Sequence, residues 1–582
     1  MMSIKNKYKE CAGRLCCGIA AAIMAAPMLT ACADWDDHYD ADSSVAESQK
    51  ATLWQNIEQN GNLTQFAELL RKTGFNEQLK ASQTYTVWAP QDNTYDYSTL
   101  LSQNNTRVLK QFVQNHIARN SYPASGELNK NINMMNEKVM HFGGNGSYTI
   151  QGVSLSQPNV GSSNGLLHVI NGRIPFRQNI YESLNNEDYA LDSISKYILS
   201  FDEKKIDESK SVEGPVLNGE QTYLDTVYYE NNDLMNLLDA YVNSEDSSYT
   251  MLAPTNEAWN KARATITKYF KFLPKFEYLE NTSEKNSVEV KVKDPEFMRD
   301  SLSNLLLTAS LFYNNNLYDN GKLKSLKDGE NPKVDSLMTT SRFKMYSEDA
   351  ADLFANAHRV DKSNGAIWVV DTLQMRTWTC WNPELRIEAE YSSYWSGYKD
   401  VANSPEAVTV NTQNPEVAGR VSNNRYLEVA PISSVSNPEI DFFLPNVRSA
   451  DYSVYVVMVP ANIHTANYAG KVQKNLVTFT LGYADENGKI KETAYSNLET
   501  RTDSSAVDTV YVGDITFPVS YVGLASSSAM YAPYLRVRSR VSSRQSALYD
   551  RTLRIDCIIL RPKELDTYIK EHPSYVYDRN LY

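Results

Sequence analysis

Two short motifs occur twice in this chain, in the same order, and this repeat limits the possible folds more than any other sequence feature. The first motif reads YTVWAPQDNTY at residues 85–95 and YTMLAPTNEAW at residues 249–259. The second reads SNGLLHVIN at residues 163–171 and SNGAIWVVD at residues 363–371. Because both motifs return in the same order, the sequence predicts a duplicated domain.

The residue types of each motif indicate its local structure. Residues 85–88 favour a strand, and Pro90 ends it because proline cannot donate a hydrogen bond to a neighbouring strand. Asp92 or Asn93 can then cap a following helix, so the first motif predicts a strand-to-helix corner. In the second motif an Asn-Gly turn leads into an apolar strand.

Helical spacing precedes the first corner. Apolar residues recur with roughly helical periodicity at 53–57 and at 63–70, and the helix breakers Asn60 and Gly61 separate the two stretches. Each copy therefore reads as helices, corner, helices and then strands, which predicts an α+β domain.

These motifs resemble the fasciclin (FAS1) domain, whose first conserved stretch reads like T-V-F-A-P-T-N-E-A-F and whose second ends in an N-G-x-[IV]-H-V-I-[DN] strand. Residues 249–259 and 167–171 match most closely, and His116 stands where the family has a Y-H or N-H pair. The resemblance implies two tandem FAS1-like domains, at residues 48–182 and 183–379. It also implies a role in adhesion and protein association, which FAS1 domains generally have.

The two copies also differ. The first has QDNTY in place of T-N-E-A-F, and Trp368 of the second replaces His168 of the first. The chain between Pro254 and Gly365 is longer than its counterpart in the first copy. We therefore expect an insertion in the second copy, in the charged stretch 271–294.

The N-terminus predicts a lipoprotein signal peptide at residues 1–31. Basic residues between positions 5 and 14 precede an apolar stretch at 15–29, and the sequence L-T-A-C ending at Cys32 resembles a lipobox. The resemblance implies that Cys32 is acylated and becomes the first residue of the mature chain. Each buried acyl CH₂ contributes about 0.8 kcal/mol to anchoring. An uncleaved N-terminal membrane helix is the alternative.

Acidic residues follow the predicted lipid anchor directly, over a tether at residues 32–47. The run contains Asp34, Asp36, Asp37 and Asp40, and it resembles the surface-export signal of Bacteroidota lipoproteins. This implies a lipid-anchored, surface-exposed position on the outer membrane. A solvated acidic tether facing the other side of that membrane is the alternative.

After residue 380 the pattern changes to short alternating runs. Period-two alternation at residues 385–390, 452–459, 476–481 and 553–560 predicts an antiparallel, jelly-roll-like β-sandwich over 380–564, followed by a tail at 565–582. The opening I-E-A-E strand and the closing D-x-[IV]-x-L strand loosely resemble carbohydrate-binding β-sandwiches.

Four aromatic residues follow the first of these strands: Tyr391, Tyr394, Trp395 and Tyr398. Pyranose rings pack on aromatic faces, so the group is a weak candidate for a ligand site that stacks sugars. The alternative is a loop whose aromatic side chains pack onto the sandwich.

Of six cysteines, three leave with the signal peptide and Cys32 takes the lipid. Cys380 and Cys557 remain, and they either form a disulfide or are buried thiols. Seven histidines are widely scattered, and His168, in a predicted core strand, reads as a hydrogen-bonded buried histidine. The sequence therefore predicts no metal site and no cofactor.

Catalytic signatures such as H-E-x-x-H, G-x-S-x-G and Walker loops do not occur, so the sequence predicts a protein that is not an enzyme. The net charge of −13 argues against nucleic-acid binding.

Together these features predict an adhesion module, or a module that binds glycan or protein, with a SusC/SusD-like nutrient importer as a candidate partner. One alternative is a structural subunit of an outer-membrane complex that binds no glycan. Another is a glycan-degrading enzyme whose paired carboxylates are hidden among 70 acidic residues.

Overall fold

The computed structural model of the chain describes residues 49–577 except 186–188, 207, 209–210, 218, 226–227, 282–285, 411–413, 415–416, 418, 464–471, 496–499 and 525–532. The predicted signal peptide, Cys32 and the acidic tether lie outside the described residues. The contacts divide the chain into two compact units, Met1–Pro175 and Phe176–Tyr582, with no division at the predicted boundary 379/380. In the part that the structure describes, no helix is long and apolar enough to cross a membrane.

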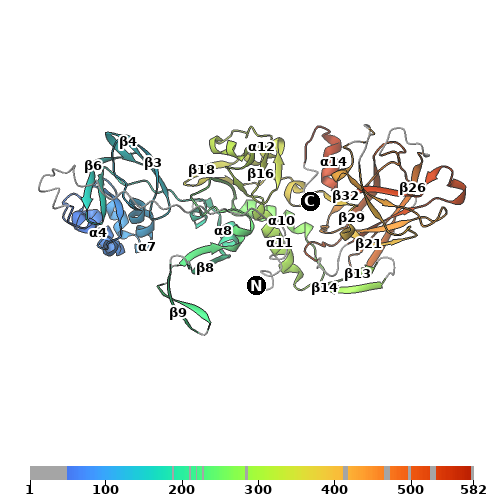
Figure 1. The fold of residues 1–582 in the computed structure, drawn as a ribbon, viewed down its shortest axis with the longest axis horizontal. Coiled ribbons are helices and arrows are strands. Elements are labelled where there is room, and N and C mark those ends of the chain that lie inside the picture. Colours follow the sequence, from blue (N-terminus) through green and yellow to red (C-terminus); the bar gives the residue numbers. More distant parts are fainter. Residues whose placement is uncertain are drawn as a thin grey trace, which may run out of the picture. The chain divides into compact units, whose positions relative to one another are not determined.

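The first unit, hereafter the first domain, is a seven-stranded sheet with helices on one side (Figure 1). The predicted helices at 53–57 and 63–70 are confirmed as α3 and α4. The helices are α3 (Leu53–Glu58), α4 (Thr64–Thr73), α5 (Phe75–Gln78), α6 (Tyr97–Ser102) and α7 (Asn105–Val108). The strand order is β2 (Ile117–Arg119), β1 (Tyr85–Pro90), β7 (Gly165–Ile170), β6 (Val153–Ser162), β5 (Ser147–Ile150), β4 (Val139–Asn145) and β3 (Glu127–Asn133).

Both faces of the central strand pair of the first domain are buried. Val87 and Leu167 point into a core shared with α3 and α4, whereas Trp88 and Ile170 point into a second core shared with β3 to β5. Strands buried on both faces need continuous apolar runs, as the second motif has.

The helix cap predicted from the first motif is wrong in its direction. Asp92 does not cap the helix that follows it but accepts hydrogen bonds from the backbone of Thr64 (3.0 Å) and Gln65 (2.9 Å), at the start of α4. The following helix, α6, is capped by Asp96 instead. Asp92, just after β1, thus caps the N-terminus of the earlier helix α4.

The second unit begins with a smaller sheet, which we call the second domain together with its helices up to α13. Its strand order is β15 (Phe312–Asn314), β12 (Tyr249–Pro254), β19 (Gly365–Val370) and β18 (His358–Lys362). Its helices are α8 (Asp192–Leu199), α9 (Asp233–Leu237), α10 (Asn256–Ile266), α11 (Pro295–Ala309), α12 (Ser347–Phe354) and α13 (Thr377–Cys380).

The two repeated motifs form the central strand pair in both domains. β1 runs parallel to β7 with Tyr85 opposite Gly165, and β12 runs parallel to β19 with Tyr249 opposite Gly365. The six residue pairs of one ladder match the six of the other without a register shift. Each motif therefore supplies one of two neighbouring strands.

The charged stretch 271–294 forms a hairpin of β13 (Lys275–Asn281) and β14 (Asn286–Lys291). A longer hairpin, between α8 and α9, was not predicted. Its base pairs β8 (Asp202–Ile206) with β11 (Tyr228–Asn232), and its outer part pairs β9 (Val212–Leu217) with β10 (Glu220–Asp225). A further hairpin pairs β16 (Ser336–Met338) with β17 (Lys344–Tyr346).

The C-terminal region, from residue 385 onward, is strand-rich, as predicted, and its strands form two sheets. The first contains β22 (Glu406–Thr409), β23 (Arg425–Val429), β32 (Leu553–Pro562), β25 (Asp451–Met458) and β29 (Asp508–Thr516), with β20 (Leu385–Glu388) also paired to β32. The second contains β21 (Trp395–Lys399), β24 (Glu439–Phe443), β30 (Tyr534–Ser539), β26 (Lys474–Ala484) and β27 (Ile490–Ala494), with β28 (Thr500–Arg501) and β31 (Tyr549–Asp550) paired to β26.

The residues predicted as a C-terminal tail include most of a helix, α14 (Lys563–Glu571). Its Leu565 and Asp566 are each 1% exposed, and the helix packs on β25 and β32. This segment is therefore part of the folded unit.

Candidate functional site

The four predicted aromatic residues do not form one exposed face. Tyr391 and Tyr398 are each 45% exposed, but Tyr394 and Trp395 pack against the core. The indole Nε1 of Trp395 donates a hydrogen bond to Ala389 O at 2.7 Å. Only the two exposed rings are thus free to receive a ligand, and the role of the group in binding stays a prediction.

A second group of polar side chains, which the sequence analysis missed, lies where the first and last strands of the C-terminal region meet. β20 carries Glu388 and is followed by Glu390, and β32 carries Asp556 and Cys557. The two strands pair antiparallel with Glu388 opposite Cys557. We call Glu388, Glu390 and Asp556 the acidic cluster.

A turn of 3-10 helix, η8 (Ser422–Asn424), holds this cluster in place. Ser422 donates from its backbone N–H to Asp556 Oδ1 at 3.0 Å and from its hydroxyl to Glu388 Oε1 at 2.8 Å. Asn423 Nδ2 lies 3.4 Å from Glu390 Oε1. One short turn therefore positions all three carboxyl groups.

Among the residues that the structure describes, positive charge near the acidic cluster is scarce. The Nε of Arg386 lies 3.8 Å from Glu388 Oε1 and donates to Cys557 Sγ at 3.3 Å. One guanidinium cannot neutralise three carboxylates whose residues are at most 8% exposed. Moreover, the second carboxylate oxygens of Glu388 and Glu390 are buried without a hydrogen-bond partner.

Burial changes the protonation of the cluster. Loss of water raises the pKa of Asp556 to about 7 and raises that of Glu388 as well, although the hydrogen bonds from Ser422 oppose both shifts. Buried carboxylates of this kind either take up protons or bind a cation.

The geometry suits a cation. Ligand atoms of Glu388, Asp556 and Cys557 lie within 4.8 Å of one another. Burial raises the pKa of the Cys557 thiol well above its usual value, which favours the protonated form and weakens the sulfur as a ligand. The carboxylate oxygens favour a hard ion such as Ca²⁺ over a thiolate-bound metal.

The remaining candidate residues have structural roles. Cys380 and Cys557 are buried free thiols, so the disulfide alternative is wrong. His168 is fully buried, as predicted, and its ring nitrogens contact Asn159 N (3.1 Å) and Tyr122 O (2.9 Å). His116 is also buried and accepts a hydrogen bond from Ile174 N at 2.9 Å.

Three solved structures are similar to parts of this chain. An insect protein, described as a FAS1 domain pair from the cell adhesion molecule Fasciclin I, is 12% identical, with 55% of this chain and 99% of that one covered and a TM-score of 0.19. A Paenibacillus xanthan lyase is 12% identical over 35% of this chain and 16% of its own, with a TM-score of 0.20. A family 35 carbohydrate-binding module from an environmental isolate is 11% identical over 31% of this chain and 93% of its own, with a TM-score of 0.17.

Comparison at the sequence level points to one family. No curated protein sequence matches the chain. The model of the Fasciclin domain matches residues 61–174, which include all seven strands of the first domain, β1 to β7. Residues 61–174 are therefore a fasciclin domain.

Proposed function

We propose that this chain is a non-catalytic adhesion or binding protein, lipid-anchored through Cys32 at the surface of a Bacteroidota outer membrane. The observation that carries the proposal is the fasciclin domain at residues 61–174, because fasciclin domains are generally adhesion modules without catalytic activity. The lipobox-like sequence before Cys32 and the acidic run behind it support the anchor.

In this proposal the second domain is a second FAS1 repeat and the C-terminal region is a β-sandwich. The repeat is supported by the matching ladders of β1 with β7 and β12 with β19. The sandwich is supported by apolar residues of both sheets, such as Val456 and Phe479, that share one core. A glycan, a surface protein or a SusC/SusD-like importer would contact the outward surfaces.

Affinity electrophoresis against a panel of glycans tests the binding role. We expect retardation of the wild-type chain and its loss in the double variant Tyr391→Ala/Tyr398→Ala. The matched control is Tyr511→Ala, since Tyr511 is also 45% exposed but lies on β29. Co-purification with a large outer-membrane barrel without retardation would favour the structural-subunit alternative, and release of sugar products would favour an enzyme.

A Cys32→Ser variant tests the anchor. Without the thiol no acyl chain can be attached, so we expect the protein to leave the membrane fraction for the soluble fraction. Retention of the variant at the wild-type level would contradict a lipid anchor and favour the uncleaved membrane helix.

The acidic cluster favours a second function, and we propose that it holds a divalent cation of the Ca²⁺ type. The unpartnered oxygens of Glu388 and Glu390 would supply ligands together with Asp556. An ion that bridges β20 and β32 would stabilise the junction between the ends of the C-terminal region.

Calorimetric titration of the EDTA-treated chain with Ca²⁺ tests this second proposal. We expect binding and a higher melting temperature of the second unit in the wild type, and neither in Glu388→Gln/Glu390→Gln. The exposed Glu406, changed to Gln, is the control. Because the pKa of Asp556 is raised to about 7, protons should weaken binding below that pH. An unchanged melting temperature in the wild type would exclude the site.

A further inference from the structure

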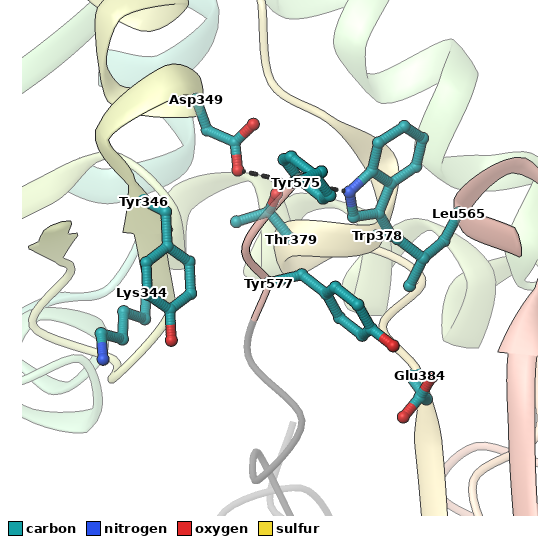
Figure 2. Close-up of a pocket in the computed structure, with 9 residues that line it drawn as sticks. All are labelled: Lys344, Tyr346, Asp349, Trp378, Thr379, Glu384, Leu565, Tyr575 and Tyr577. Atoms are coloured by element: carbon teal, nitrogen blue, oxygen red, sulfur yellow. Dashed lines mark hydrogen bonds between the residues drawn. The ribbon is translucent and has the colours of Figure 1, made fainter. Parts of the chain in front are cut away.

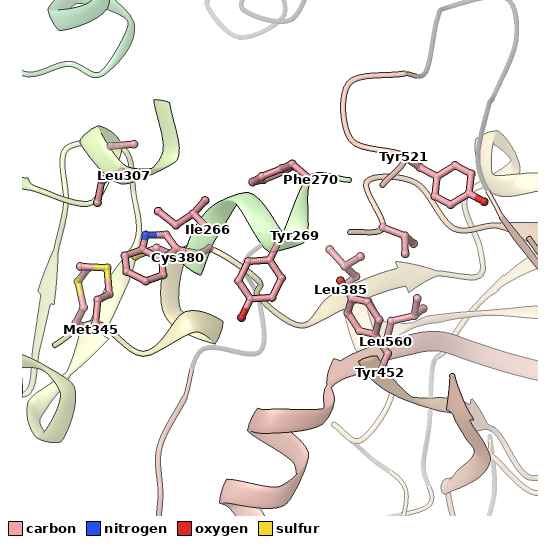
Figure 3. Close-up of a cluster of buried hydrophobic side chains, with 14 of the residues drawn as sticks. Ile266, Tyr269, Phe270, Leu307, Met345, Cys380, Leu385, Tyr452, Tyr521 and Leu560 are labelled. Atoms are coloured by element: carbon pink, nitrogen blue, oxygen red, sulfur yellow. The ribbon is translucent and has the colours of Figure 1, made fainter. Parts of the chain in front are cut away.

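The second domain and the C-terminal region share one hydrophobic core. Figure 3 shows Ile266, Tyr269 and Phe270, from α10 and the turn after it, in the same cluster as Leu385 and Leu560 of the C-terminal region. Two adjacent domains in one chain usually move relative to each other unless their interface is large and apolar. The shared core is one reason why the contacts do not divide near residue 380.

The inserted hairpin of β13 and β14 extends that core and adds polar contacts beside it. Phe276 of β13 is 3% exposed, and its ring meets that of Tyr521 edge-on at 5.7 Å between centroids. The backbone N–H of Glu277 donates to Gly488 O at 2.6 Å, and its carboxylate pairs with Lys489. The hairpin thus binds the turn between β26 and β27.

Residues 563–577 supply a second attachment, on the second domain. The hydroxyl of Tyr575 donates to Asp349 Oδ2 at 2.9 Å and accepts from Trp378 Nε1 at 2.9 Å, as Figure 2 shows. Tyr575 is 8% exposed and Asp349 is 4% exposed. This single hydroxyl group therefore contacts the buried carboxylate of α12 and the half-buried indole of α13.

α14 strengthens the same attachment. The hydroxyl of Tyr568 donates to Glu348 Oε1 at 2.6 Å, and the guanidinium of Arg376 lies 4.4 Å from the centre of the Tyr568 ring. Arg376 also pairs with Asp349 at 2.6 Å. The contacts bring residues more than 200 positions apart in sequence together around one arginine.

We propose that residues 563–577 act as a clasp that makes the second domain and the C-terminal region unfold as one cooperative unit. When the ring of Tyr575 is withdrawn, the buried Asp349 carboxylate loses a hydrogen-bond donor, which is costly, and the half-buried Trp378 indole loses its acceptor. The shared core and the inserted hairpin also join the two parts, and the proposal is that these contacts alone do not keep unfolding cooperative once the clasp is lost. The clasp works whatever ligand the protein binds.

Scanning calorimetry of the whole mature chain tests the clasp, with the first domain as an internal reference. We expect two transitions in the wild type, one for each compact unit. Tyr575→Ala should give three, because the second unit splits into its two parts. Val576→Ala is the matched control, since Val576 is adjacent and 56% exposed, and it should keep two transitions.

A second unit that still melts in one transition in Tyr575→Ala, at any temperature, would overturn the clasp, as would three transitions in the wild type. If Tyr575→Ala does not fold, Tyr575→Phe keeps the ring and removes only the two hydrogen bonds. Amide hydrogen exchange in the buried connection 381–384 should then rise about tenfold relative to Val576→Ala. Equal exchange in those two variants would also overturn the proposal.

Discussion

The first and second domains place the same strand pair in different surroundings. At one rung of the ladder the first domain pairs Trp88 of β1 with His168 of β7, and the second pairs Leu252 of β12 with Trp368 of β19. All four side chains are fully buried. Each pair thus contains one tryptophan, on β1 in the first domain and on β19 in the second. The total side-chain volume of the pair is therefore similar in the two domains, although the residues at both positions differ.

The element that packs against this residue pair also differs between the two domains. Trp88 meets Phe142 of β4 edge-on at 5.5 Å, and Trp368 meets Phe354 of α12 edge-on at 5.3 Å. A strand supplies the aromatic partner in the first domain and a helix supplies it in the second. The comparison teaches that the motifs fix the central strand pair, while the elements that cover it can be exchanged.

The largest expected effect comes from the glycine that both ladders share. A Cβ on Gly165 would lie 2.0 Å from Tyr85 O, and one on Gly365 would lie 1.8 Å from Tyr249 O, with φ values of +148° and +142°. Gly165→Ala and Gly365→Ala should each destabilise their own domain by about 4 kcal/mol or more. Urea unfolding measures this loss, and Gly61→Ala, at an open position, is the control. A loss below about 1 kcal/mol would show that the close strand approach is not required.

A second shared feature is the asparagine before each of these glycines. Asn164 and Asn364 are buried, and each makes three hydrogen bonds to backbone groups ahead of its ladder, those of Leu53, Leu79 and Ala81 or of Ile180, Val242 and Ser244. Replacement by alanine removes three hydrogen bonds, each contributing about 1 kcal/mol, so we expect a loss of about 3 kcal/mol in either domain. Asn→Asp keeps the acceptor but not the donors. Unequal losses for the two alanine variants, measured in urea, would break the equivalence of the domains.

The strand pairs could be predicted from the sequence because their information is local. Apolar runs after an Asn-Gly turn and before a Pro give β7 and β1 directly. The direction of the Asp92 cap could not be predicted, because its partners Thr64 and Gln65 lie 27 to 28 residues earlier. Side-chain patterns describe neighbours along the chain, whereas this cap depends on tertiary contact.

The acidic cluster shows the same limit. Strand alternation places Glu388 and Glu390 on one side of their segment, which is a usable signal in the sequence. Asp556 joins them only because β20 pairs with β32, and Ser422 joins only through a separate turn. The clasp likewise requires knowing that Tyr575 reaches α12, which no spacing in the sequence indicates.

Acid should destabilise the first unit more than the second, because the first contains two buried histidines. Burial lowers the pKa of His116 and His168 to about 4, below the value of about 6.5 in an unfolded chain. Between these values the unfolded state binds more protons, so stability is lost as pH falls from 6.5 to 4, by about 2 kcal/mol per histidine down to pH 4.5. Asp556 of the second unit, with its pKa raised to about 7, works in the opposite direction in the absence of a cation.

Calorimetry at pH 7 and pH 4.5 measures this difference. The melting temperature of the first unit should fall more than that of the second, and His168→Gln should reduce the gap. Equal shifts of both transitions would show that the buried histidines do not control acid sensitivity.

The smallest expected effect concerns the charge at the corner. Asp92 accepts from two backbone N–H groups at the start of α4, while in the second domain the neutral Asn256 accepts from Ser193 N at 2.8 Å. A carboxylate is favoured at a helix N-terminus, so Asp92→Asn should cost the first domain about 0.5 kcal/mol and Asp92→Ala about 1 kcal/mol. Asn256→Asp should instead destabilise the second domain, because it removes the hydrogen bond that Asn256 Nδ2 donates to Asp192 at 2.9 Å and places a second carboxylate there. Salt screens both effects. At 1 M NaCl, the free energies of unfolding of the Asn and Asp forms of each corner, measured in urea, should therefore differ less.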